Sequence, residues 1–203
     1  MTFLLDPYAA RSCPVKTFNA FDPGTPKPES PLDESLLEAF SGGSEFRDSM
    51  LKALCRAADV VDLRGEKNAT ETLDAMDAGA SVIIGGTLPA DEQGHRVGNP
   101  DALVRGGDRP GGRPGYWPLR VKPYRLLEEQ RNAKELRVAT FTSPTVLEPL
   151  PGYRFRSYRQ GVLLELAHHW RLLQACGRSA STAIVGSIGF DDRTRGVIVW
   201  VPL

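Results

Sequence analysis

The sequence lacks the features that mark disulfide-bonded, secreted and membrane-spanning proteins. Its three cysteines, Cys13, Cys55 and Cys176, are odd in number and show no Cys-x-x-Cys spacing, which argues against a disulfide framework or a zinc site. The first residues lack the basic segment and the long apolar run of a signal peptide. No apolar stretch approaches the roughly 20 residues of a membrane span. We therefore expect a soluble cytoplasmic protein that has no membrane partner.

The sequence also has no net charge, yet its charged residues are unevenly distributed. Residues 1–100 carry nine Lys or Arg against sixteen Asp or Glu, whereas residues 101–203 carry sixteen against nine. Between Arg105 and Arg137 there are nine basic residues and four acidic ones. Such a stretch is typical of a face that binds a polyanion, because each neutralised phosphate releases counterions. The alternative is a solvated surface whose charges pair with the acidic half.

Size and composition favour one globular domain spanning residues 1–203. A hydrophobic content of 41% and a charged content of 25% are ordinary globular values. A chain of this length buries roughly 70% of its unfolded surface, so it folds without disulfides or a structural metal. The chain ends at Leu203 directly after an apolar run. That run is either a final sheet strand or a sign that the chain is a fragment, and we favour a fragment, which a C-terminal domain or a partner protein would complete.

Helical and extended patterns alternate along the chain, which predicts an α/β domain with a mixed central β-sheet flanked by helices. Prolines and glycines predict a loop region over residues 22–43, and Ser44 is a suitable N-cap for the helix that follows. The other helical segments are expected within residues 9–21, over 70–79, weakly over 124–136, and over 158–176. Extended segments are expected over residues 59–64, 81–88, 101–105, 116–124, 137–153 and 181–203.

The central stretch, residues 79–124, contains the candidate chemistry. Asp101 opens one expected strand and Lys122 lies near the end of the next. An Asp and a Lys on neighbouring strands could hold a divalent metal and an activated water. The alternatives are structural, because Asn99-Pro100-Asp101 is a common turn that needs no metal, and a lysine at a strand end is usually an exposed charge.

Six segments in order resemble motifs of one nuclease family: ARSCPVK, GGSEFRDSMLKAL, TLDAMDAGASVIIGGTL, GNPDALVR, YWPLRVKPY, and the helix over 158–176 with its closing hairpin. Together they are similar to the RecB-like nucleases of the PD-(D/E)xK superfamily. The resemblance implies a restriction-endonuclease-like core and a hydrolase that cuts DNA with Mg²⁺ or Mn²⁺, as in DNA repair.

The resemblance also implies roles for individual residues. Asp101 and the helix carboxylate Glu45 would hold the metal, and Lys122 would orient the attacking water and offset negative charge. Arg105, Arg120 and Arg125 would face the phosphates of DNA. An acid near the start of a helix is also favoured by the helix dipole alone, and Asp48 is a rival to Glu45 one turn later.

Three positions depart from the family pattern. Arg120 stands where the tripeptide needs a carboxylate, and Glu165 and His169 stand where Gln and Tyr are usual. A guanidinium beside a divalent cation costs several kcal/mol of metal affinity, even at an effective dielectric near 20. The resemblance therefore leaves two hypotheses, a metal-dependent nuclease or an inactive domain of that fold that binds nucleic acid or protein. Whether another carboxylate, such as Asp62, replaces the one lost at position 120 stays open.

Overall fold

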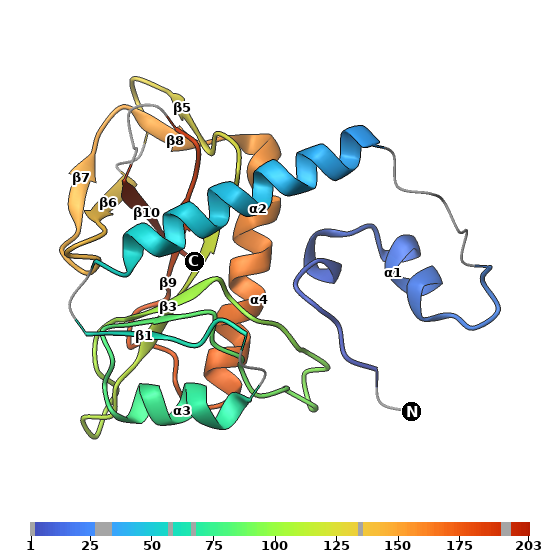
Figure 1. Cartoon of the computed structure of the whole chain (residues 1–203), viewed down its shortest axis with the longest axis horizontal. Helices are drawn as coiled ribbons and strands as arrows, with labels where there is room; N and C mark the ends of the chain where they lie inside the picture. The colour runs from blue at the N-terminus through green and yellow to red at the C-terminus, as the bar shows by residue number, and fades with distance from the viewer. Residues whose placement is uncertain (1–2, 27–33, 57–58, 66–67, 134–135, 192–195) are drawn as a thin grey trace.

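An eight-stranded mixed β-sheet forms the centre of the molecule (Figure 1). The computed structural model describes residues 3–26, 34–56, 59–65, 68–133, 136–191 and 196–203, and only the backbone of residues 34–41. The strands of the sheet lie in the order β1-β2-β3-β4-β9-β10-β6-β7. Their bounds are β1 Val60–Asp62, β2 Val82–Ile84, β3 Ala102–Arg105, β4 Tyr116–Val121, β6 Leu136–Thr140, β7 Glu148–Leu150, β9 Ile184–Ile188 and β10 Val197–Pro202. A separate antiparallel pair joins β5 Leu127–Glu129 to β8 Tyr153–Phe155.

Not all of the helices pack against this sheet. Their bounds are η1 Ala9–Arg11, α1 Pro14–Phe21, α2 Glu34–Leu54, α3 Ala69–Asp77, η2 Ser157–Arg159 and α4 Gly161–Ala175. In Figure 1, α2 crosses in front of α4, whereas α1 stands apart from the sheet and buries none of its residues. Within the described part of the chain, no helix has the length and apolarity needed to cross a membrane.

Two apolar clusters fix the helices that matter for the site. The larger joins α2, α4 and the sheet through fully buried side chains that include Leu51, Leu166 and Leu119. The smaller joins α3 and the end of α4 to the sheet through Met76 and Leu172. Because each such side chain contributes about 1.5–3 kcal/mol when it is fully buried, α2 and α4 are held firmly against β3 and β4.

The α/β architecture with a mixed sheet and flanking helices is confirmed. The strand, turn, strand, loop, strand order expected over residues 79–124 is also found, since β2, β3 and β4 pair antiparallel in sequence order. The helices expected over residues 70–79 and 158–176 correspond to α3 and to η2 with α4. The more specific restriction-endonuclease-like core stays a prediction.

Two local predictions are wrong. The loop expected over residues 22–43 gives way to helix at Glu34, so Ser44 lies inside α2 and is no N-cap. A glycine at position 43 allows α2 to pack closely on Pro123, because a Cβ at this position would approach Pro123 Cγ to 3.3 Å. The weak helix expected over residues 124–136 is replaced by β5, which pairs with a strand more than twenty residues later.

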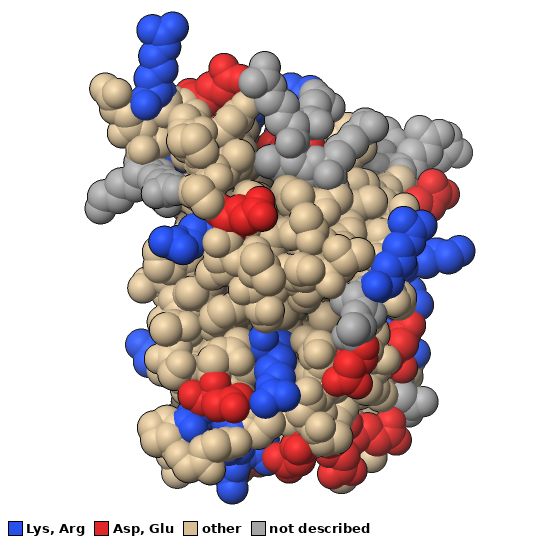
Figure 2. All heavy atoms as spheres, turned by 90° about the vertical axis from the view of Figure 1, so that its left-hand side faces the viewer, with Lys and Arg blue, Asp and Glu red and all other residues tan. Residues whose placement is uncertain are grey.

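Among the described residues, the face on the β7 side carries no dominant charge of either sign. Figure 2 shows a broad area of uncharged residues there, with Lys, Arg, Asp and Glu side chains mostly around its border.

Candidate functional site

The sheet brings the two ends of the central motif together. Ala102 of β3 pairs with Leu119 of β4, and the amide of Asp101 donates to the Leu119 carbonyl at 3.0 Å. Continuing this antiparallel register by one residue places Asp101 opposite Arg120. Lys122 follows directly after β4. The neighbouring-strand arrangement predicted for Asp101 and Lys122 is therefore present.

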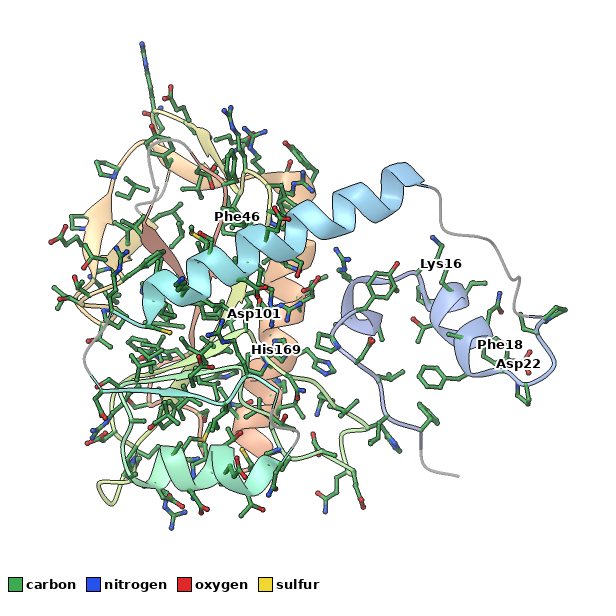
Figure 3. All side chains as sticks on the ribbon, viewed as in Figure 1. Lys16, Phe18, Asp22, Phe46, Asp101 and His169 are labelled. Carbon is green, nitrogen blue, oxygen red and sulfur yellow. The ribbon has the colours of Figure 1, made fainter. Side chains whose placement is uncertain are left out.

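The Asp101 carboxylate is buried and already has three donors. Its Oδ1 accepts from Arg47 Nε at 2.6 Å and from Arg120 Nη1 at 3.4 Å. Its Oδ2 accepts from the backbone amide of Val121 at 2.7 Å. Figure 3 shows Asp101 beside α2, the helix that supplies Arg47. Both oxygens of this carboxylate therefore already accept hydrogen bonds from the protein, two of them from cations.

The Glu165 carboxylate on α4 is the second buried acid of the site. It accepts from Lys122 Nζ at 2.7 Å and pairs with Arg11 Nε at 3.0 Å. Arg120 Nε lies 3.5 Å from the same carboxylate. Arg120 therefore stands between the two acids and contacts both of them.

We call these six residues the charge cluster: Arg11, Arg47, Asp101, Arg120, Lys122 and Glu165. Four cations surround two carboxylates, which leaves a formal charge of +2. The carboxylate side chains are 3–4% exposed, whereas those of Arg11 and Arg47 are 37% and 41% exposed. The acids are therefore covered by cations that still reach solvent, so the surface that the cluster presents is positive.

Burial shifts the pKa of two basic groups here, Lys122 in the cluster and His169 beside it. Desolvation lowers the pKa of Lys122, and its hydrogen bond to Glu165 opposes that shift. His169, one turn after Glu165 on α4 and labelled in Figure 3, is fully buried. Desolvation, and then the charge of Arg120, hold the pKa of His169 well below its ordinary value. Neither ring nitrogen has a hydrogen-bond partner among the described residues, so His169 is neutral in the folded protein near pH 7.

This burial predicts a loss of stability in mild acid. In the unfolded chain His169 takes up a proton below its ordinary pKa of about 6.5, whereas the folded protein excludes that proton, so stability falls as the pH falls. Between pH 7.5 and pH 5 the cost approaches about 2 kcal/mol. We expect urea denaturation to show this loss of unfolding free energy in the wild type and a smaller loss in His169→Leu. His95→Gln is the control and should lose as much as the wild type, because His95 is exposed. A loss in His169→Leu as large as that of the wild type would contradict the assignment of the acid sensitivity to His169.

Two of the other predicted residues, Glu45 and Arg105, lie away from the cluster. Glu45 is exposed on α2, and it precedes Arg47 by two residues, about 200° around the helix, so it points away while Arg47 contacts Asp101. Arg105 ends β3 at the far end from Asp101 and donates to the carbonyl of Gly79 and to Asp108. Arg125 is exposed beyond the end of β4.

The rival carboxylates do not complete a metal site either. Asp62 accepts two short bonds from its own neighbour Arg64, and it lines a shallow depression with Asp48 and Lys52. Among the described residues, no three His, Cys, Asp or Glu side chains stand together as a metal-holding group. Arg11 and Arg47 were not anticipated from the sequence, because the strand or carboxylate that a helical arginine meets depends on tertiary packing.

No protein-family model, curated protein or solved structure matches this chain. The residues that would hold Mg²⁺ or Mn²⁺ can be tested against the geometry directly. Such hard cations need several free oxygen ligands, and here one carboxylate is bound to Arg47 and Arg120 and the other to Lys122 and Arg11. The donor set therefore does not fit a divalent cation.

Proposed function

We propose that this chain is a nucleic-acid-binding domain that contacts phosphates through the charge cluster and does not cut them. The observation that carries the proposal is Arg120, which contacts both buried carboxylates and leaves the cluster with an excess of two positive charges. A guanidinium presents several donors in a planar fork that matches the oxygens of a phosphate. The order of the sequence motifs and the basic second half of the chain support a polyanionic partner of this kind.

Metal-dependent hydrolysis is the second candidate. It is favoured by one observation, namely that Asp101 and Lys122 do meet in a single cluster at the ends of β3 and β4. For that chemistry, Arg47 and Arg120 would first have to leave the Asp101 carboxylate. The two candidates differ in their need for metal, which makes them separable in one assay.

The test is fluorescence anisotropy with labelled DNA at several NaCl concentrations, with EDTA or with Mn²⁺. We expect the same dissociation constant in EDTA and in Mn²⁺. The logarithm of the association constant should fall with the logarithm of the salt concentration at a slope of about −2 to −4. Arg120→Gln should weaken binding several-fold and reduce that slope by about one. Arg64→Gln is the matched control, because Arg64 is paired with Asp62 outside the cluster.

Two results would contradict the proposal. One is binding that disappears in EDTA, which would show that a metal bridges protein and DNA. The other is cleavage of the DNA in Mn²⁺ that is lost in Asp101→Ala, which would establish the nuclease instead.

A further inference from the structure

Tyrosines and arginines alternate around the start of α4. Arg159 places its guanidinium carbon 3.8 Å from the ring centroid of Tyr124 and 5.1 Å from that of Tyr158. Arg156 lies 5.7 Å from the Tyr158 ring centroid and donates to the Tyr158 hydroxyl. We call these four residues, together with Tyr8 and Arg11, the tyrosine–arginine surface.

This surface is continuous with the charge cluster. Arg11 stacks over Tyr8 at 4.8 Å and also pairs with Glu165 at 3.0 Å. The same Arg11 side chain lies close to Gly161, the first residue of α4, where an added Cβ would come within 3.4 Å of Arg11 Cδ. Figure 1 shows the first segment of the chain, which contains η1, beside α4. A ligand held by the cluster could therefore extend along the start of α4.

Two of the three rings are open to solvent. Tyr8 is 56% exposed and Tyr158 is 64% exposed, whereas Tyr124 is partly covered by Arg159. By contrast, Tyr116 and Trp117 of β4 are buried in the sheet. An exposed ring with a guanidinium at its side offers a face for a base and a donor for the adjoining phosphate.

We propose that the tyrosine–arginine surface stacks unpaired bases of a single-stranded nucleic acid whose phosphates lie on the charge cluster. This inference rests on the proposed function, since the cluster supplies the backbone contacts. Bases in a duplex are stacked on each other and cannot cover Tyr8 or Tyr158, so only unpaired bases use these rings. The surface is cationic as well as aromatic, which suits a polyanion carrying π-faces better than an uncharged apolar partner.

The test compares a labelled 15-nucleotide oligothymidine, an oligouridine of the same length and a DNA duplex by anisotropy. We expect Tyr158→Ala to weaken binding of the oligothymidine about five- to tenfold and to leave duplex binding unchanged. Tyr158→Phe keeps the ring and should keep the affinity. Phe18→Ala, which removes a 67% exposed ring on α1, is the matched control and should change nothing. The oligouridine arm shows whether RNA or DNA is the preferred source of unpaired bases.

The outcomes separate this inference from the proposed function. Salt-sensitive binding that Tyr158→Ala leaves intact, or weakens equally for duplex and single strand, overturns the stacking surface and keeps the phosphate-binding cluster. Failure of all three nucleic acids to bind overturns both and points to a protein as the partner. Tyr158 is exposed, so its replacement should leave the thermal unfolding temperature unchanged, and this is checked first.

Discussion

Replacing Arg120 by glutamate is expected to give the chain a Mn²⁺ site that the wild type lacks. The change removes a cation from between Asp101 and Glu165 and adds a third carboxylate at the same position. At about 5 Å and an effective dielectric of 20, one pair of unit charges is worth about 3 kcal/mol, so reversing a charge beside a divalent ion exceeds that figure. Calorimetry should show Mn²⁺ affinity rising at least about a thousandfold over the wild type.

Three further variants isolate the cause of that gain. Arg120→Gln removes the positive charge without adding a ligand, and should bind Mn²⁺ far more weakly than Arg120→Glu. Arg131→Glu makes the same change of charge at an exposed position in the loop after β5, and should bind none. Adding Asp101→Ala to Arg120→Glu should abolish the new site. Micromolar Mn²⁺ binding by the wild type would show that Arg47 and Arg120 do release Asp101. Metal-dependent hydrolysis would then be the favoured function.

The sequence was sufficient where the signal is local. The alternation of apolar residues and turn residues predicts β2, β3 and β4, and the order of these strands places Asp101 near Lys122. The apolar stripe over residues 158–176 predicts α4 because its period matches a helix. These features depend on residues that are close together in the chain, so a sequence pattern can record them.

The sequence was insufficient to predict local structure that depends on a long-range contact. Asp191 is buried, and its carboxylate accepts from the backbone amides of Leu126 and Leu127, some 65 residues earlier. This contact, with the pairing to β8, holds residues 127–129 as a strand although their composition suits a helix. In the same way, α2 begins at Glu34, so Glu45 is well inside the helix and Arg47 meets Asp101. The face a helix turns inward follows from packing.

Two of the three departures noted in the sequence, at positions 120 and 165, become one arrangement in the structure. Position 120 carries a guanidinium in place of the expected acid, and position 165 carries an acid in place of the expected amide. The Glu165 carboxylate then takes up the three cations left around it, Lys122, Arg11 and Arg120. Both buried carboxylates are thereby paired with protein cations, and the cluster keeps its excess of two positive charges.

Removing the Glu165 carboxylate is accordingly expected to destabilise the fold strongly. Glu165→Ala leaves the mostly buried Lys122 and Arg120 without their shared acid, and breaking a buried pair in this way costs about 3–5 kcal/mol. Desolvation lowers the pKa of Lys122 and its hydrogen bond to Glu165 opposes that shift, so the carboxylate offsets part of the cost of burying the lysine charge. Differential scanning calorimetry should show an unfolding temperature lower by roughly 10 °C for a domain of this size.

The matched control is Glu128→Ala, which breaks an equally short ion pair with Arg154 in a more exposed place. That loss should stay below about 1 kcal/mol, because solvent screens the pair. Lys122→Met combined with Glu165→Gln should recover most of the stability, since it removes both buried charges together. If Glu165→Ala lowers the free energy of unfolding no more than Glu128→Ala does, the Glu165 carboxylate does not stabilise the cations of the cluster. Glu165→Gln also raises the formal charge of the cluster from +2 to +3. This variant should therefore bind DNA more tightly than the wild type although it is less stable.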